Sequence, residues 1–232
     1  MTIVKKTGIY ILGLFVLALG ISVSVKSNLG VSPVSSLPYV LSRIVEIEMG
    51  YFTMAVFISF IVVQLFILRR EFRILSSIQI LVSIAFGYFV NLSNFMLRNI
   101  ETPDPMILRV VLAVSSAALC GLGIFLYIAP SIMPLPGEGL TEAISYKTGK
   151  PFSRIKVYFD LTMVVFSLVF SLGFLGRIDG IGIGTLISAL LIGKFVGIFS
   201  KLLKEKVQMF LGNPDTLIAK AHVQVAKKST LE

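Results

Sequence analysis

Long apolar runs separated by short polar segments dominate the pattern of this chain. Six of the runs are close to the ~20 residues that an α-helix needs to cross a bilayer. These runs lie at 8–25, 51–68, 74–97, 107–129, 155–175 and 180–200. The pattern therefore predicts an all-α polytopic membrane protein with six transmembrane helices.

Two further apolar segments, 29–47 and 132–147, are interrupted by prolines and polar residues. Each could be a full span, a surface-lying amphipathic helix, or a re-entrant segment that enters and leaves from one side. Irregular backbone at membrane depth is tolerated only where protein or a water-filled cavity surrounds it.

The placement of positive charge favours the re-entrant interpretation, because Lys and Arg collect in short cytoplasmic loops. With six crossings and a cytoplasmic N-terminus, twelve basic residues near span ends lie inside and five lie outside. If 29–47 alone also crossed, the RREFR segment at 69–73 would move outside and weaken this bias. We therefore expect a multi-pass membrane protein with both termini in the cytoplasm. Residues 29–47 then enter from outside and 132–147 from the cytoplasm, with surface helices as the alternative for both.

The two halves of the sequence resemble each other at an offset of 103–107 residues. Pro33 corresponds to Pro136, YFTMAVFISF to YFDLTMVVFS, and GYFVN to GKFVG. Each half has the order span, broken segment, span, span, so three crossings per half would give the halves opposite orientations. The expected architecture is a 3+3 inverted repeat, with repeats at 1–103 and 104–206 and a cytoplasmic tail at 207–232. Interrupted segments at matching positions of such repeats indicate the binding site of a secondary transporter.

Composition supports the membrane class and narrows the chemistry. Hydrophobic residues make up 56% of the chain and charged residues 14%, with a mean hydropathy of +0.92, whereas soluble domains carry about 25% charged residues. The net charge of +9 lies mainly at span ends, so we expect membrane lipids rather than nucleic acid as partners. Cys120 in an apolar run and His222 in the tail provide no metal site, cofactor site or catalytic constellation, so no enzyme activity is expected.

The sequences PGEGLTEAISYKTGKPF at 136–152, VYFD at 157–160 and NLGVSPVSSLP at 28–38 carry a family resemblance. On these residues the chain resembles the YczE/YyaS/YitT family of uncharacterised bacterial membrane proteins over roughly residues 8–200. YitT-like members usually have a Gly-Gly pair where this chain has Pro136-Gly137-Glu138-Gly139. The resemblance implies a polytopic protein of the bacterial inner membrane and assigns no activity.

The broken segments contain the candidate substrate site. Ser32 before Pro33 has the pattern of a helix N-cap followed by proline at the first helical position. A helix that starts inside the membrane points free N–H groups at a bound anion, and Ser32, Ser35 and Ser36 would add hydroxyls. Ordinary capping at a membrane surface is the alternative.

The second broken segment offers Glu138 and Glu142, one helical turn apart. On a re-entrant segment, at least one should face water or hold a proton, because a bare carboxylate in a membrane is costly. Such carboxylates suit proton coupling or the capture of a cation. On a cytoplasmic segment both would simply be solvated.

Asp160 and Lys194 lie about 8–9 Å inside the cytoplasmic ends of their predicted spans, at ~1.5 Å per residue. We expect them to form a charge pair or a proton relay, with a purely structural ion pair as the alternative. Small residues allow close helix packing, so the GxxxG pairs at 176–180 and 193–197 are expected to serve contacts within the chain or in a homo-oligomer.

The resulting hypothesis is a transporter-like protein that moves a small polar metabolite or ion, with carboxylates suited to proton coupling. The alternative is a non-transporting membrane accessory protein that binds a lipid or a protein partner.

Overall fold

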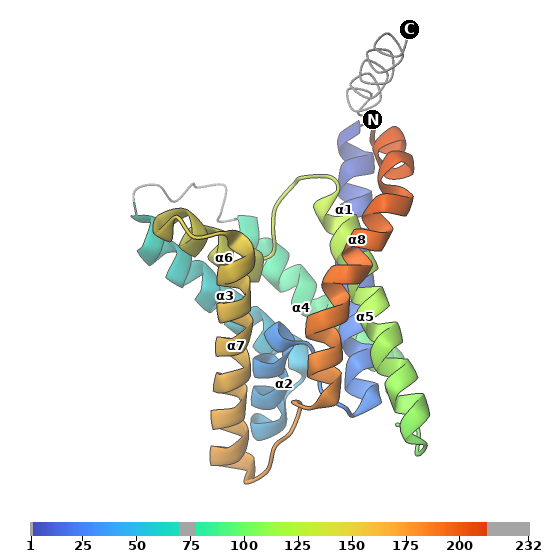
Figure 1. Cartoon of the computed structure of the whole chain (residues 1–232), viewed down its shortest axis with the longest axis vertical. Helices are drawn as coiled ribbons and strands as arrows, with labels where there is room; N and C mark the ends of the chain where they lie inside the picture. The colour runs from blue at the N-terminus through green and yellow to red at the C-terminus, as the bar shows by residue number, and fades with distance from the viewer. Residues whose placement is uncertain (1, 70–77, 213–232) are drawn as a thin grey trace, which may run out of the picture.

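The computed structural model of the chain describes residues 2–69 and 78–212, and within these residues every regular element is helical (Figure 1). The elements in order are α1 (Thr2–Ser27), α2 (Pro33–Val45), α3 (Met49–Leu68), α4 (Ile78–Met96), α5 (Met106–Ile128), α6 (Pro136–Thr148), α7 (Phe152–Phe170), the π-helical turn η3 (Ser171–Leu175) and α8 (Ile183–Leu211).

Six of these helices are long and apolar enough to cross a membrane: α1, α3, α4, α5, α7 continued by η3, and α8. They match the six predicted runs, so the chain is a multi-pass membrane protein. The last helix differs in length, because it continues past residue 200 to Leu211 through a segment rich in helix-forming residues. The predicted tail therefore still belongs to α8 as far as Leu211, and residues 213–232 lie outside the described part, as do 70–77.

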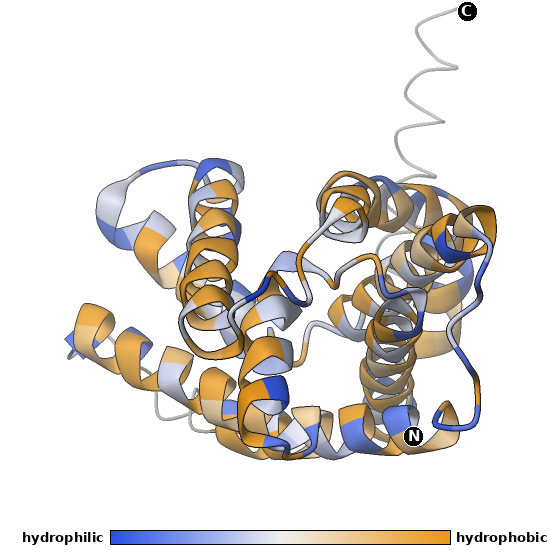
Figure 2. Ribbon diagram, turned by 90° about the horizontal axis from the view of Figure 1, so that it is seen from below, coloured by the Kyte–Doolittle hydropathy of each residue, from blue (hydrophilic) through white to orange (hydrophobic). Residues whose placement is uncertain are grey.

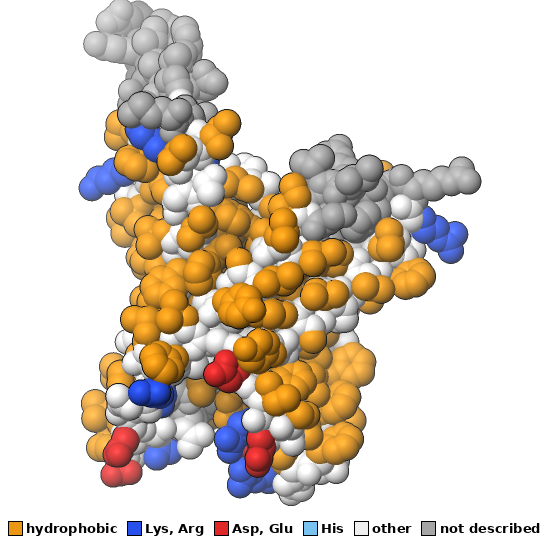
Figure 3. Space-filling model, turned by 180° about the vertical axis from the view of Figure 1, so that it is seen from behind, with side chains coloured by type: hydrophobic (Ala, Val, Ile, Leu, Met, Phe, Trp, Pro, Cys, Tyr) orange, Lys and Arg blue, Asp and Glu red, His pale blue; other side chains and the backbone are white. Residues whose placement is uncertain are grey.

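Apolar side chains cover most of the outer surface. In the view from behind, hydrophobic side chains fill the middle of the face, and Lys and Arg side chains lie toward its ends (Figure 3). Along the ribbon, hydrophobic positions follow the helices while hydrophilic positions gather near helix ends and connections (Figure 2). Large apolar residues such as Leu81, Phe95 and Leu190 are exposed, as expected for helices that face lipid.

The most extensive helix contact joins α1 to α5, flanked by α4 on α1 and by α8 on α5. A Cβ built on Gly123 would lie 2.4 Å from the Leu17 backbone nitrogen, and one on Gly20 would lie 2.7 Å from that of Cys120. Glycine is therefore required for the two backbones to approach this closely. Cys120 is a buried packing residue in this contact.

The GxxxG pairs singled out in the sequence do not provide this packing. A Cβ on Gly193 or Gly197 would meet nothing within 4 Å, and Gly176 and Gly180 adopt left-handed turns with φ of 65° and 72°. The packing glycines in α1 are Gly13 and Gly20 instead, which lie two helical turns apart on one face.

The short helices α2 and α6 pack with α3 and α7 to form the second part of the structure. The main long-helix partner of α2 is α7, and that of α6 is α3, so each short helix packs against a long helix from the other half of the sequence. Among the described residues, α7 and α8 barely touch, although one follows the other in the chain; their connection at 176–182 spans the separation (Figure 1).

Local backbone geometry recurs between the halves of the chain. The helices α2 and α6 both start at a proline and are both 13 residues long. Each ends at a left-handed residue, Glu46 with φ 59° and Gly149 with φ 66°. Asn28 and Ser131, which follow α1 and α5, also share a positive φ, of 50° and 54°. The offset of 103 seen in the sequence is therefore also present in the turns of the backbone.

Replacing Gly123 by Ala is expected to lower stability by about 1–3 kcal/mol, because the new methyl group overlaps the backbone of α1. Gly193→Ala is the matched control: its methyl group meets open space, and alanine favours a helix over glycine by about 1 kcal/mol. Thermal unfolding in detergent should therefore show opposite shifts for the two variants. Equal shifts would contradict the assignment of the α1–α5 contact.

Candidate functional site

The first turns of α2 and α6 meet inside the protein. A Cβ built on Gly137 would lie 3.6 Å from Cγ1 of Val34, an ordinary van der Waals distance. The residues before the two starting prolines are extended, Ser32 with ψ 151° and Leu135 with ψ 154°, as the residue before a proline prefers. Residues 32–36 and 136–140 are therefore brought together at Val34 and Gly137.

The hydroxyls of Ser32, Ser35 and Ser36, at the start of α2, form hydrogen bonds within this turn and to α7. Ser32 Oγ donates to Ser35 Oγ at 2.9 Å, and Ser36 Oγ donates to the Pro33 carbonyl at 2.7 Å. The hydroxyls of Ser36 and Ser167 are also 2.7 Å apart, and both residues are fully buried. Ser36 therefore acts as a contact between helices, and Ser32, which is partly exposed, is the most accessible of the three predicted hydroxyls.

Side chains from three long helices hold the segment before α6. Gln64 Nε2 of α3 donates to the Pro136 carbonyl at 3.2 Å, and Gln79 Nε2 of α4 donates to the Pro134 carbonyl at 3.2 Å. The Tyr10 hydroxyl of α1 donates to the Met133 carbonyl at 3.0 Å. Sequence reasoning missed these residues, although two buried glutamines in apolar runs were an available signal.

Gly139 belongs to the same arrangement. A Cβ at this position would lie 2.7 Å from Gln79 Nε2 and 2.9 Å from Gln64 Oε1. The glycine therefore lets both amides reach the turn, which explains part of the PGEG sequence noted above.

Glu138 lies in the first turn of α6 and is partly buried. Its carboxyl approaches the Tyr127 hydroxyl and lies within electrostatic reach of Lys156 and Asp160. Burial raises the pKa of the Glu138 carboxyl above its ordinary value of 4.5, and the positive charge of Lys156 opposes this rise. The carboxyl is therefore easier to protonate than one in water.

Two buried polar atoms beside this turn have no hydrogen-bond partner, Tyr127 Oη and Gln79 Oε1. Tyr127 is 1% exposed, and its ring packs edge-on against that of Tyr10, with centroids 6.2 Å apart. Its hydroxyl and the Glu138 carboxyl approach each other without completing a hydrogen bond. Buried polar groups are normally paired, so a solute, a water molecule or a small shift of Glu138 would satisfy this hydroxyl.

Asp160 pairs with Lys156 rather than with the predicted Lys194. Lys156 Nζ and Asp160 Oδ1 are 2.5 Å apart, in an i,i+4 pair on α7. Lys194 is exposed on α8, which barely touches α7. A partner one turn away on the same helix requires no packing between helices, and this is why the pairing across the two spans is not formed.

The five predicted substrate-site residues do not form one cluster. Glu142 is exposed on α6, and no described hydrogen bond joins Ser32, Ser35 or Ser36 to either glutamate. The residues that do come together are Glu138, Tyr127, Tyr10, Lys156 and Asp160, which we call the inner polar centre.

The inner polar centre can hold and release a proton and offers carboxylates to a cation or amine. Within the described ranges, no three His, Cys, Asp or Glu side chains are grouped so that they could hold a metal ion.

Comparison with known proteins places these features in a family. The profile of a family of unknown function (DUF6198) matches residues 4–201. The chain is 25% identical over 196 residues to the uncharacterized protein YyaS of Bacillus subtilis (strain 168), covering 84% of this chain and 92% of YyaS. No solved structure matches.

The raised pKa of Glu138 predicts a pH-dependent stability. Between pH 4.5 and the raised value, the folded state binds more protons than the unfolded state, so stability should fall as pH increases through this window. Glu138→Gln removes the charge and should flatten this part of the profile, whereas the exposed Glu142→Gln should leave it unchanged. Thermal unfolding in detergent at a series of pH values measures this. The same slope in the wild type and in Glu138→Gln would show that Glu138 is solvated.

Proposed function

The chain belongs to the DUF6198 family of unknown function, and from this premise we propose that it is a membrane transporter of a small polar metabolite or ion. The observation that carries the proposal is the meeting of the first turns of α2 and α6 at Val34 and Gly137. Broken helices at matching positions of two repeats, with the solute site between them, are typical of secondary transporters.

The contact between α1 and α5 supports an inverted repeat. Gly20 approaches Cys120, and Gly123 approaches Leu17. At the offset of 103, Gly20 corresponds to Gly123 and Leu17 corresponds to Cys120, so exchanging the halves turns each contact into the other. This reciprocity is what a two-fold axis between residues 1–103 and 104–206 produces.

In this proposal α2 and α6 are re-entrant. The segment 29–47 enters from outside and 132–147 from the cytoplasm, with both chain termini in the cytoplasm of the inner membrane. Buried residues in the first turn of each helix, such as Ser36 and Gly137, support this placement over a surface-lying one.

Glu138 is the proposed coupling residue. The first turns of both short helices point toward their meeting place, where free N–H groups and the helix dipole favour negative charge. Glu138 is thus stabilised as an anion by α6 and Lys156 and as an acid by burial. These opposing effects allow protonation to alternate with solute binding, and the function requires no covalent chemistry.

A second candidate is a non-transporting accessory protein that binds a lipid or another protein. A cavity of about 520 Å³ between α3 and α7 favours it, because its walls are mainly apolar and aromatic. Phe60, Phe159 and Phe166 line this cavity, with Leu140 and Ile144 of α6, so it would suit a lipid acyl chain. The open glycines of α8, Gly193 and Gly197, leave a face for a homo-oligomer in either case.

Transport is tested in proteoliposomes that contain a trapped pH-sensitive dye. Mixtures of amino acids, organic acids and amines are added outside in turn under an imposed proton gradient. We expect at least one mixture to change the proton flux through the wild type, and Glu138→Gln to reduce that change at least tenfold, because a fixed neutral side chain cannot carry a proton. Lys194→Gln, at an exposed site, is the matched control. A folded wild type that responds to no mixture would favour the accessory protein.

Topology is tested by cysteine labelling in a Cys120→Ala background. Glu46→Cys, in the turn after α2, should react with a membrane-impermeant maleimide on intact spheroplasts, because the first broken segment returns to the outside. Lys150→Cys, in the turn after α6, should react only after the membrane is opened. Labelling of both positions from the same side would refute the inverted repeat.

A further inference from the structure

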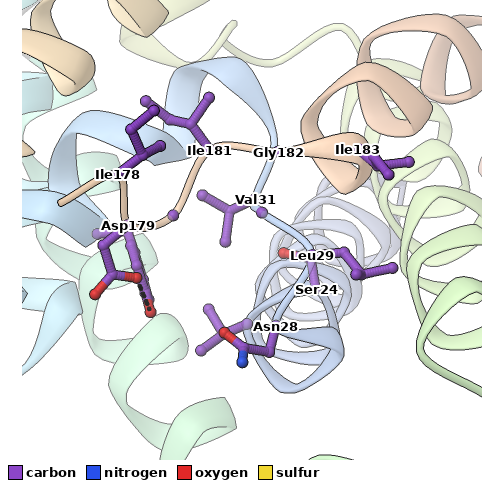
Figure 4. Close-up of a pocket in the computed structure, with 13 residues that line it drawn as sticks. Ser24, Asn28, Leu29, Val31, Ile178, Asp179, Ile181, Gly182 and Ile183 are labelled. Carbon is purple, nitrogen blue, oxygen red and sulfur yellow. Dashed lines mark hydrogen bonds between the residues drawn. The ribbon is translucent and has the colours of Figure 1, made fainter. Parts of the chain in front are cut away.

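A second polar site lies away from the inner polar centre, where the end of α1 faces the segment before α8 (Figure 4). Its cavity of about 240 Å³ is lined by residues 24–25 and 28–31, Tyr39 and residues 178–183. An adjoining cavity of about 320 Å³ is lined by Asn28, Tyr39, Arg43 and residues 177–179. These two neighbouring cavities share Asn28, Tyr39, Ile178 and Asp179, and together we call them the Asp179 pocket.

Backbone hydrogen bonds fix the walls of the pocket. The Val31 N–H donates to the Gly180 carbonyl at 3.0 Å, and the Gly184 N–H donates to the Leu29 carbonyl at 2.8 Å. Gly30 has φ 108°, and a Cβ there would lie 2.6 Å from Thr185 Oγ1. The two segments are therefore locked together, and the pocket is preformed.

Asp179 lies at the centre of the charged groups, with its side chain 14% exposed. Its carboxylate accepts from the Tyr39 hydroxyl at 3.3 Å and lies 3.5 Å from Arg43 Nε and 3.6 Å from an Arg177 nitrogen. Charge-assisted bonds are normally about 2.7–2.9 Å long, so both arginines are held loosely. Their side chains are 51% and 67% exposed, which leaves most of their donors available.

The charges of these three side chains do not balance. Two guanidinium groups share the Asp179 carboxylate, so one positive charge is in excess inside the pocket; the other acidic side chain beside these arginines, Glu46, lines a neighbouring cavity and is exposed to solvent. The start of α8 at Gly182 and Ile183 also lines the cavity and adds the partial positive charge of a helix N-terminus. A ligand that neutralises this arrangement carries one negative charge.

The rest of the pocket is suited to a short apolar body with few polar contacts. In the close-up, Val31 and Asn28 lie across the cavity from Asp179 (Figure 4). Val25, Ile178 and Ile183 provide further apolar surface, and the Asn28 amide provides a polar contact.

We propose that the Asp179 pocket binds a small organic monoanion, with its carboxylate between Arg43 and Arg177 and its short apolar body in the cavity beside α1. The identification of this monoanion as a transported substrate, bound from the outer side, rests on the proposed function. Binding itself does not require transport. In this arrangement Asp179 orients the arginines and competes with the ligand for them.

The test is equilibrium binding to the purified full chain in detergent, by calorimetry at constant ionic strength. The probes are sodium butyrate and sodium benzoate, and the matched neutral probes are butyramide and benzamide. We expect saturable binding of the carboxylates and at least tenfold weaker binding of the amides. The Arg43→Gln, Arg177→Gln double variant should weaken carboxylate binding at least tenfold, whereas Arg98→Gln, outside the pocket, should leave it unchanged.

Binding to the Asp179→Asn variant tests whether the Asp179 carboxylate competes with the ligand for the arginines. Removing the competing carboxylate should tighten butyrate binding several-fold. If Asp179→Asn instead abolishes binding, and 4-aminobutyrate binds the wild type better than butyrate, the ligand is a zwitterion whose amine pairs with Asp179, and the monoanion proposal is wrong. Equal binding of carboxylates and amides would overturn it as well.

Gel filtration and unfolding without ligand establish that each variant is folded. If the double variant is not folded, Arg177→Lys replaces it, and this variant is expected to bind the carboxylates a few-fold more weakly than the wild type. Binding without flux would leave the pocket standing and remove the transport proposal. Flux without carboxylate binding would support transport and overturn the proposal that the Asp179 pocket binds a monoanion.

Discussion

The structure depends on how two non-helical segments satisfy their backbone polar groups in a largely apolar protein. Residues 28–32 and 129–135 leave α1 and α5 before the next helix begins, so they lack the internal hydrogen bonds of a helix. The second segment contains Pro130 and Pro134, which have no N–H to satisfy. Its carbonyls at Met133 and Pro134 accept from side chains of α1 and α4, and the carbonyl of Pro136, the first residue of α6, accepts from a side chain of α3. The first segment is instead paired by the backbone of Gly180 and Gly184.

These two ways of pairing the segments accompany a difference between the halves of the chain: α3 packs on α4, whereas among the described residues α7 and α8 barely touch. Gln64 and Gln79 bind the same segment from α3 and α4, which pack against each other. In the other half, Gly180 of the connection and Gly184 of α8 pair with the segment after α1, and α7 bonds to α2 through Ser167 and Ser36. The Asp179 pocket lies beside the connection between α7 and α8.

The sequence predicted the features that depend on local composition. Long apolar runs specify the six spanning helices, and Pro33 and Pro136 specify where α2 and α6 begin, because proline at the first helical position is a local preference. Features that depend on which helices pack together could not be predicted in this way. Asp160 has Lys156 as its partner because α7 and α8 are apart, and Gly13 and Gly20 pack on α5 although they lack the GxxxG spacing. The roles of Gln64, Gln79, Tyr127 and Asp179 could not be predicted either, because each of these side chains interacts with residues that are distant in the sequence.

The separation of α7 from α8 has a mechanical consequence. Between them lie a π-helical turn and a connection with two left-handed glycines, Gly176 and Gly180. Such turns absorb rotation of the backbone at low energetic cost. No large α7–α8 interface therefore joins α2, α3, α6 and α7 to α8. The Asp179 carboxylate, bonded to Tyr39 of α2, lies within this connection, so the hydrogen bonds of Val31 with Gly180 and of Gly184 with Leu29 carry much of the mechanical link between the two parts.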